Sequence, residues 1–551
     1  MRRPTLVIAV ALALTLVASG GTAGAASRAA PREAAGSAGA SAGLSAAMTC
    51  DQLAKADFST VPDAPTAVMS AKLVAATPDV AEHCEVSAYV TPQVQFTLKL
   101  PTRTWNGRYY QTGCGGYCGS IAADQISACV DAVKGGFAAA ATNDGHVSTS
   151  RFDGLWAFKD HDAVVDYGYR AVHVVSVASK TIVQTFYGRS PEKSYFQGCS
   201  DGGREALMEA QRYPDDFNGI IAGAPAFLFS YLVAAHNLGD QRANRDVAGR
   251  QIIGPDQVRI LERAVLARCD RLGDGIVSDP RNCSFDPGVV QCRADGQTDC
   301  LTPEQVAAAR KMYQGPVNRR GVGLYPGAGD GPGVKFPGSE GAWLAWQVAA
   351  PDAALSRNGF TADQYLKYFA FDRPPGPGYD TDDFDWNRDL QKISKSAQIL
   401  NSADPNLDQF HAKGGKLILY HGWGDTAIPP TGTLWYYNQL QQRYGGVEKV
   451  QRWARLFMLP GVYHCNGGPG PDQFDFLGQV VAWVEQGAAP NRVVGSHLTN
   501  GAVDRTRPVF PYPTRAEYSG HGDVNNEASF VGVTPSTPPD DDFRWIIDPR
   551  S

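Results

Sequence analysis

The stretch Gly198-Cys199-Ser200-Asp201-Gly202-Gly203 decides the fold class of this 551-residue chain. It fits the pattern G-x-S-x-G, a sharp turn between a strand and a helix that exposes a serine hydroxyl at the edge of a sheet. Residues 194–197 (SYFQ) indicate the end of a buried strand, and residues 204–213 contain no glycine or proline, as expected for a helix. The stretch therefore predicts an α/β-hydrolase fold with Ser200 as nucleophile.

Two later segments supply the partners that this serine needs. Asp425 ends the segment HGWGD, which follows the apolar run 416–420, and His464 follows the apolar run 456–459. Buried parallel strands end at one edge of a sheet, so both residues are expected near Ser200. The order serine, aspartate, histidine is also the order found in α/β-hydrolases. We therefore predict a catalytic triad of Ser200, Asp425 and His464.

A glycine-rich loop at residues 113–116 (GCGG) is the candidate for the oxyanion hole. It comes after two strand-like runs, 85–90 and 94–99, which should open the sheet. In hydrolases of this fold, one backbone N–H comes from such a loop and the other from the residue after the nucleophile. The expected donors are the N–H of Asp201 and that of Gly115 or Gly116. A plain tight turn is the alternative for the loop.

Cysteines stand next to both the candidate nucleophile and the candidate base, as Cys199 and Cys465. If Ser200 and His464 lie within hydrogen-bond reach, their neighbours can approach to the roughly 4.4–6.8 Å between Cα atoms that a disulfide requires. A bond between them would tie the two catalytic loops together.

Four stretches carry a resemblance to a known family: residues 195–225, 414–430, 455–470 and the tail RTRP…PYP at 505–513. On these stretches the chain resembles the tannase and feruloyl esterase family, whose signature is a serine and a histidine flanked by bonded cysteines. The resemblance implies a secreted α/β-hydrolase with a large inserted lid domain that cleaves esters of aromatic acids such as gallate and ferulate. An esterase of mono(hydroxyethyl) terephthalate belongs to the same group.

Eleven cysteines indicate a disulfide framework with one thiol left over. The resemblance implies four pairs, which are Cys199 with Cys465, Cys50 with Cys84, Cys269 with Cys283, and Cys292 with Cys300. Of the remaining Cys114, Cys118 and Cys129, two can pair, and the sequence leaves open which. Phe510 and Gly532 stand where the family often has a further cysteine pair.

Residues 269–279 (CDRLGDGIVSD) resemble the calcium loop of the family. Asp270, Asp274, Asp279 and the carbonyl of Ile276 are the candidate ligands, because hard oxygen donors on a glycine-bearing turn suit calcium. The segment is a few residues shorter than the family pattern and lacks one aspartate. It is therefore either a weakened structural calcium site in the lid or an acidic turn held by the Cys269–Cys283 bond. No redox or organic cofactor is expected.

The remaining sequence suggests how the chain is organised. Residues 1–25 have the basic, apolar and A-x-A regions of a signal peptide, and residues 26–47 are an Ala-, Gly- and Ser-rich leader or linker expected to be disordered. The catalytic domain is assigned to residues 48–225 and 405–551, with a lid at 226–404. The net charge of −6 argues against a nucleic-acid partner, and no later apolar run is long enough to span a membrane.

Together these features predict a secreted serine esterase of the feruloyl esterase or tannase type, acting through an acyl-enzyme on small aromatic esters or plant cell-wall esters. Alternatives are a peptidase, a lipase or an aromatic polyester monomer esterase on the same triad. A non-catalytic wall-binding protein would be expected to lose a triad residue. Lid aromatics within 227–229, 369–371 and 384–386 are expected to shape the pocket, with His421 lining it, and His146 is expected to be structural.

Overall fold

The computed structural model describes residues 43–78, 80–294, 296–325 and 337–537. The predicted signal peptide and residues 26–42 of the predicted leader lie outside this part. Residues 44–47, which we also assigned to the leader, are hydrogen-bonded to the folded chain. Leu44 N–H donates to the carbonyl of Trp105 at 2.8 Å, and Ala47 N–H donates to that of Phe186 at 2.9 Å. The ordered chain therefore begins before residue 48.

A nine-stranded sheet forms the centre of the described part, in the order β1-β2-β3-β5-β4-β6-β7-β8-β9. Strands β1, β2, β3 and β5 pair antiparallel, and β5, β4, β6, β7, β8 and β9 pair parallel. The later parallel strands are buried along almost their whole length, which is why their sequences are apolar runs without alternation. The bounds are β1 Thr66–Val74, β2 His83–Val90, β3 Val94–Pro101, β4 Arg108–Thr112, β5 Ala138–Thr142, β6 Lys193–Cys199, β7 Gly219–Gly223, β8 Lys416–Gly422 and β9 Ala454–Leu459.

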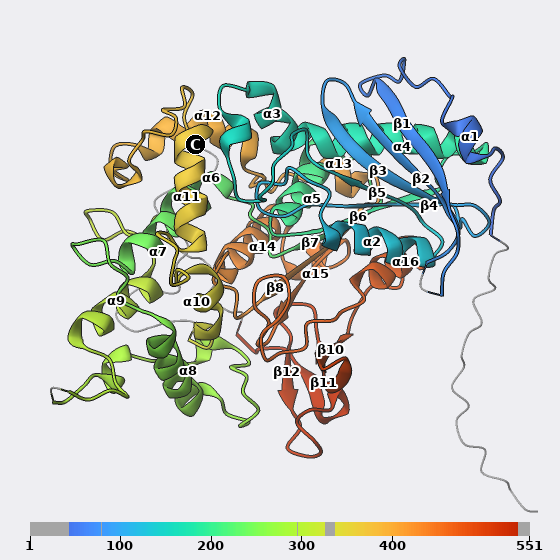
Figure 1. Cartoon of the computed structure of the whole chain (residues 1–551). Coiled ribbons are helices and arrows are strands. Elements are labelled where there is room, and N and C mark those ends of the chain that lie inside the picture. The colour runs from blue at the N-terminus through green and yellow to red at the C-terminus, as the bar shows by residue number, and fades with distance from the viewer. Residues whose placement is uncertain (1–42, 79, 295, 326–336, 538–551) are drawn as a thin grey trace, which may run out of the picture. The chain divides into compact units, whose positions relative to one another are not determined.

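Helices cover both faces of this sheet (Figure 1). On one face pack α4 (Ala171–Tyr187), α5 (Asp201–Arg212) and α14 (Pro430–Tyr444), and on the other α2 (Ala123–Lys134) and α16 (Phe476–Gln486). The helix expected at 162–187 forms, but it consists of α3 (His161–Val165), a π-helical turn at Asp166–Arg170 and then α4. This three-layer arrangement is an α/β-hydrolase fold.

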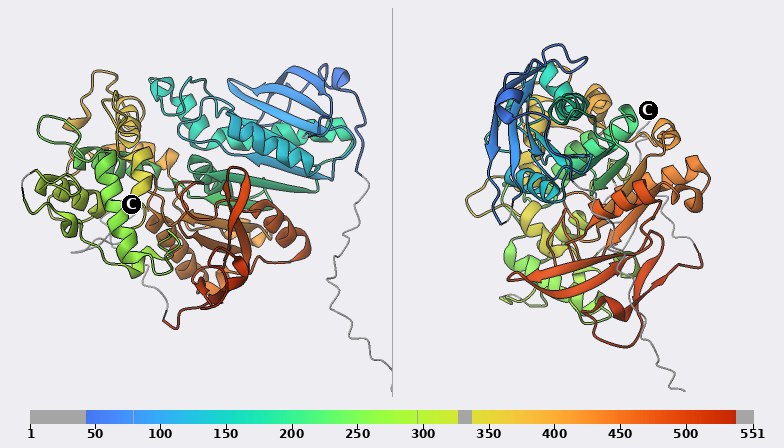
Figure 2. Two further views of the ribbon diagram at one scale, coloured as in Figure 1. Left: turned by 60° about the horizontal axis from the view of Figure 1, so that its bottom comes forward. Right: turned by 90° about the vertical axis from the view of Figure 1, so that its right-hand side faces the viewer.

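The segment between β7 and β8, where we expected the lid, is helical in its described residues (Figure 2). Figure 2 shows this green to yellow segment gathered at one side of the sheet in the left view. Part of it has a core of its own, in which Val258, Leu261, Val306 and Trp343 are buried together. Its helices are α6 Phe229–Tyr231, α7 Leu238–Ala243, α8 Pro255–Cys269, α9 Pro303–Gln314, α10 Glu340–Trp346, α11 Arg357–Tyr368 and α12 Ser394–Leu400, with a π-helical turn at Leu232–Asn237.

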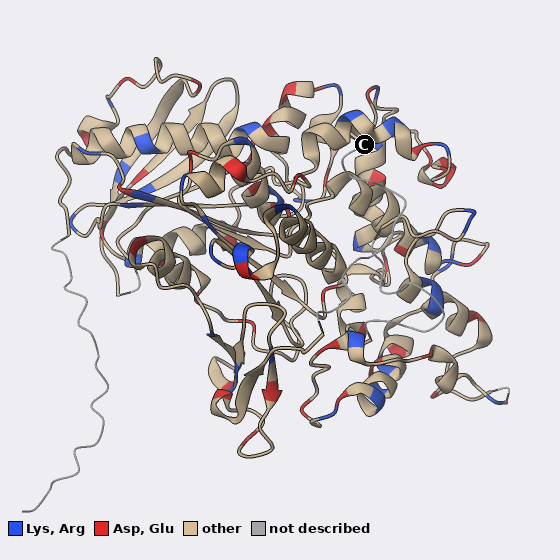
Figure 3. Cartoon of the chain, turned by 180° about the vertical axis from the view of Figure 1, so that it is seen from behind, with Lys and Arg blue, Asp and Glu red and all other residues tan. Residues whose placement is uncertain are grey.

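Smaller elements complete the described chain. Two two-stranded sheets near the C-terminus pair β10 (Val493–Thr499) with β11 (Ala502–Val509), and β12 (Arg515–Tyr518) with β13 (Phe530–Val533). Short helices are α1 Cys50–Leu53, α13 Asp408–Ala412 and α15 Val447–Val450. Figure 3 shows acidic and basic residues interspersed along the chain. None of the helices in the described residues has the length and apolar character needed to cross a bilayer.

Candidate active site

Ser200 stands at the turn between β6 and α5 in a strained backbone conformation, with φ 68° and ψ −120°. Its N–H donates to the carbonyl of Gly223 at 3.0 Å, which anchors the turn to β7. Gly198 is required here, because a Cβ at that position would lie 2.3 Å from the carbonyl oxygen of Gly202. Such a conformation costs on the order of 1–3 kcal/mol and persists at functional sites where the surroundings enforce it.

The three residues predicted as a triad form one hydrogen-bonded chain. His464 Nε2 lies 2.8 Å from Ser200 Oγ, and His464 Nδ1 lies 2.7 Å from Asp425 Oδ2. Asp425 follows β8 and His464 follows β9, so both come from the carboxyl ends of parallel strands. The imidazole is therefore oriented by the carboxylate while its other nitrogen faces the serine hydroxyl.

Asp425 is buried and held from several sides. Its Oδ1 accepts hydrogen bonds from the N–H groups of Ala427 and Ile428 at 2.9 and 3.0 Å. Burial alone would raise the pKa of this carboxyl, but His464 and His421 together lower it below its usual range. The carboxylate is thus kept ionised beside the imidazole.

His421 does not line the cavity as we expected. It is fully buried, with Nε2 3.2 Å from Asp425 Oδ2 and 2.9 Å from the carbonyl of Ile428, and Nδ1 2.8 Å from Thr433 Oγ1. The sequence placed this histidine beside the acid, but only the structure shows that its ring holds the acid rather than facing the cavity.

A cavity of about 910 Å³ opens in front of Ser200 and His464. The candidate oxyanion residues Asp201, Gly115 and Gly116 all line it. Among the described residues, no backbone carbonyl accepts from the N–H groups of these three residues outside regular helices and strands. The three residues therefore stay the candidates for the oxyanion donors.

The walls of the cavity differ from our expectation. Of the aromatics predicted from the lid, Phe229 lines the cavity, whereas Phe227, Phe369 and Phe384 belong to the main core. Three further lining residues were not predicted from the sequence. They are Phe152, Arg357 and Trp346, and the ring of Trp346 meets the His464 ring edge-on at 5.0 Å between centroids. No local pattern distinguishes these three residues from others in loops or in the helices between β7 and β8, so the sequence offered no signal for them.

A family model described as tannase and feruloyl esterase matches residues 78–533. The chain belongs to this family. It is a carboxylic ester hydrolase, and the triad geometry agrees with that chemistry.

Two relatives and one solved structure show how similar this esterase is to other members. It is 35% identical over 522 residues to mono(2-hydroxyethyl) terephthalate hydrolase of Piscinibacter sakaiensis, and the match spans 82% of this chain and 85% of that protein. It is 30% identical to a probable feruloyl esterase B-2 of Aspergillus flavus, over 75% of this chain and 80% of that protein. The crystal structure of feruloyl esterase B from Aspergillus oryzae has a TM-score of 0.75 at 26% identity, covering 85% of this chain and 97% of that one.

Five disulfides occur in the described residues of the esterase. Cys199 and Cys465 are bonded, with 5.9 Å between their Cα atoms, so one bond joins the neighbour of Ser200 to the neighbour of His464. The other three pairs implied by the resemblance also form. Of the three cysteines whose pairing the sequence left open, Cys114 and Cys118 are bonded, and Cys129 is a buried free thiol. Phe510 and Gly532 pack together, because the aromatic ring lies where a side chain on Gly532 would point.

The acidic loop after α8 does not fit calcium. Asp270 turns inward and accepts hydrogen bonds from the N–H groups of Leu272, Gly273 and Gly275 at 2.8–3.0 Å. The carboxylate of Asp274 forms a buried ion pair with Arg507, and Asp279 is paired with Arg281. Among the described residues, these carboxylates do not gather within reach of one ion.

A different group of five buried side chains does gather closely, beneath the glycine loop. Cys114, Cys118, Asp144, Asp201 and Glu205 each offer one potential ligand atom, and these atoms lie within 4.8 Å of one another. Such a group could hold a metal ion by composition, but its two sulfur atoms are already bonded to each other. Calcium or zinc therefore has no step in the chemistry described below.

Proposed function

We propose that this esterase hydrolyses carboxylic esters of aromatic acids, of the feruloyl esterase or tannase type, through an acyl intermediate on Ser200. The observation that carries the proposal is the continuous Ser200–His464–Asp425 chain at the floor of a 910 Å³ cavity whose walls include Trp346 and Phe152. Aromatic walls bind an aromatic acyl group by stacking and by exclusion of water.

The proposed reaction follows from the positions of the side chains. Ser200 Oγ attacks the ester carbonyl carbon while His464 Nε2 accepts its proton, and Asp425 stabilises the imidazolium that forms. The N–H groups of Asp201 and of Gly115 or Gly116 bind the oxyanion, an effect worth on the order of 3 kcal/mol per donor. His464 then protonates the leaving alcohol, and a water activated by the same imidazole releases the acid.

A second candidate substrate is an aromatic ester that also carries a free carboxylate. Arg357 lines the cavity, and its guanidinium packs over the rings of Trp346 at 5.0 Å and Phe152 at 5.5 Å. Among the described residues no carboxylate pairs with it. An unpaired guanidinium held by two rings can bind a carboxylate in a bidentate manner. This favours a monoester such as mono(2-hydroxyethyl) terephthalate, the substrate named for one relative.

Secretion is part of the proposal. Five disulfides in the described residues are typical of a protein that folds in an oxidising compartment. Plant cell-wall esters outside the cell are then accessible substrates.

A hydrolysis panel tests these points. The panel contains methyl ferulate, methyl caffeate, methyl gallate, mono(2-hydroxyethyl) terephthalate and its neutral diester, with a peptide and a long-chain lipid ester for the alternatives. We expect turnover of aromatic esters and none of the peptide or lipid.

Arg357→Gln should lower kcat/KM for the monoester but not for the neutral diester. Arg151→Gln is the matched control, because Arg151 lines the same cavity but is paired with Asp124 at 3.1 Å. Preference for the lipid ester or the peptide would contradict the proposal.

A further inference from the structure

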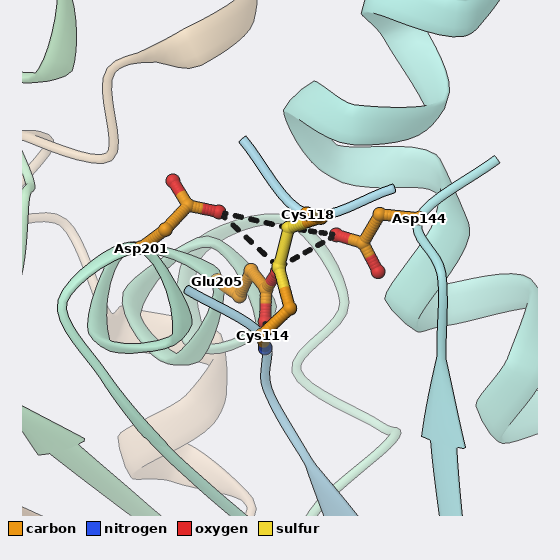
Figure 4. Close-up of side chains that lie close together, drawn as sticks. All are labelled: Cys114, Cys118, Asp144, Asp201 and Glu205. Carbon is orange, nitrogen blue, oxygen red and sulfur yellow. Dashed lines mark hydrogen bonds between the residues drawn. A yellow bond between two sulfur atoms is a disulfide. The ribbon is translucent and has the colours of Figure 1, made fainter. Parts of the chain in front are cut away.

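The buried group beneath the glycine loop has no role in the reaction described above. Figure 4 shows Asp201 and Glu205 reaching from α5, and Asp144 from the loop after β5, toward the Cys114–Cys118 disulfide. Glu205 Oε1 lies 3.1 Å from Cys114 Sγ, and Asp201 Oδ2 lies 3.6 Å from Cys118 Sγ. Burying three carboxyl groups is costly unless they are paired or hydrogen-bonded, so their partners indicate what they do.

Glu205 and its helix hold Cys114 of the glycine loop through both backbone groups of that residue. The N–H of Cys114 donates to Glu205 Oε2 at 3.2 Å, and the carbonyl of Cys114 accepts from the N–H of Gly202 at 2.9 Å. The contact leaves no spare room, because a Cβ on Gly113 would lie 2.4 Å from Glu205 Oε2. The loop is therefore fixed against the first turns of α5, next to the N–H of Asp201.

Asp144 places a second buried carboxyl group close to that of Glu205. Burial raises the pKa of both Asp144 and Glu205, and Asp144 belongs to the same buried group, with its Oδ2 3.9 Å from Cys114 Sγ. Two carboxyl groups whose oxygen atoms lie within 4.8 Å of each other in a buried site are not both ionised, so the pair keeps a proton.

The carboxylate of Asp201 has partners of its own, and one of them also contacts Gly116 at the other end of the glycine loop. Its carboxylate is paired with the buried guanidinium of Arg204 at 2.6 Å and accepts from Tyr167 O–H at 2.9 Å. The same hydroxyl lies 3.0 Å from the carbonyl oxygen of Gly116. Both ends of the stretch 114–116 are thereby attached to α5 or to a side chain bonded to it.

We propose that Glu205 is a positioning residue for ester hydrolysis: by accepting the hydrogen bond of Cys114 N–H, it fixes the glycine loop so that the loop N–H and the Asp201 N–H converge on the oxyanion. This inference rests on the proposed function, since it concerns the transition state of the same site. It assigns Glu205 no contact with the substrate.

The experiment compares four variants in the full-length esterase. Glu205→Ala removes the acceptor, Glu205→Asp keeps a carboxylate but withdraws it by one methylene, and Glu205→Gln keeps both the reach and an acceptor oxygen. Glu209→Ala is the matched control, because Glu209 is a buried acid one turn further along α5 that faces Asp216 rather than the glycine loop. Melting temperatures establish which variants fold.

Two kinetic readouts separate positioning from general destabilisation. We expect kcat on methyl ferulate to fall at least about tenfold for Glu205→Ala and Glu205→Asp with KM little changed, because a displacement of about 1 Å at a reacting group can cost on the order of a hundredfold. Affinity for an aryl trifluoromethyl ketone, which forms an oxyanion on Ser200, should fall by a similar factor while affinity for the ferulate product stays the same. Glu205→Gln and Glu209→Ala should stay within about threefold of the wild type.

Three results would overturn the inference: wild-type kcat in a folded Glu205→Asp variant, an equal loss in Glu209→Ala, or bound zinc together with free thiols at Cys114 and Cys118. If Glu205→Ala does not fold, the Asp and Gln variants decide alone. Failure of the proposed function is distinguishable, because then the wild type itself would not hydrolyse methyl ferulate.

Discussion

At the scale of single residues, the site depends on side chains that do not touch a substrate. His421 is the clearest case, because it holds Asp425 while Thr433 and Ile428 hold its own ring. His146 has a comparable role elsewhere, as expected from the sequence. Its Nε2 bonds to the carbonyl of Tyr117 at 2.7 Å, and its ring stacks on Trp156 at 3.7 Å. Each of these histidines fixes a loop that reaches the cavity.

Cys129 provides a prediction at this scale. Its thiol is buried in the core beneath α2, and burial raises its pKa to about 12. Because the thiolate is the reactive form, the native protein should not react with iodoacetamide at pH 8, and the unfolded, non-reduced protein should take up one label per chain. Mass spectrometry of both samples is the check. Labelling of the native protein, or more than one label after unfolding, would contradict the disulfide assignments.

At the scale of elements, the acidic loop after α8 is held by arginines from β11. Arg507 pairs with the carboxylate of Asp274, and Arg505 donates to the carbonyl of Asp274 at 2.7 Å. The sequence predicted an acidic loop here, but the partners of Asp274 lie more than two hundred residues away in β11. Composition shows that such a loop is acidic and does not show what neutralises it.

We predict that this loop is stabilised by Arg507 and not by calcium. Arg507→Met should lower stability by about 3–5 kcal/mol, because it leaves the buried charge of Asp274 unpaired. Adding Asp274→Asn should recover much of the loss. Thermal melts with and without chelator measure both points. A wild-type melting temperature that falls with chelator and returns with calcium would show that a metal site exists after all.

The bond between Cys199 and Cys465 joins the loops after β6 and β9. Its loss should affect activity more than folding, because Ser200 and His464 then depend on weaker contacts to keep 2.8 Å between them. The Cys199→Ala, Cys465→Ala double mutant should keep its circular dichroism spectrum and lose most of its esterase activity.

The control for that experiment is the pair Cys292→Ala, Cys300→Ala, which removes a bond in the segment between β7 and β8, far along the chain from the triad. Equal activity loss in both double mutants would indicate a general effect on stability. Full activity of the Cys199→Ala, Cys465→Ala protein would show that the bond does not position the catalytic loops.

At the scale of the molecule, the helical segment between β7 and β8 completes the site. Trp346 at the end of α10 reaches His464, and Arg357 at the start of α11 lies over Trp346. The strands and the triad were predictable because local patterns fix them: buried apolar runs, a strained turn and two acid-base residues after strands. The cavity walls were not predictable, because they depend on how the helices between β7 and β8 pack, as the core positions of Phe227 and Phe369 show.

The measurement that tests the central claim most directly is kcat of Ser200→Ala on methyl ferulate beside the wild type, with the melting temperature of both proteins. The triad predicts a loss of several orders of magnitude, because the substitution removes the nucleophile. It also predicts little change in melting temperature, because only one hydroxyl is lost. A folded Ser200→Ala protein that keeps more than about a tenth of wild-type kcat would contradict the assignment of Ser200, and with it the mechanism.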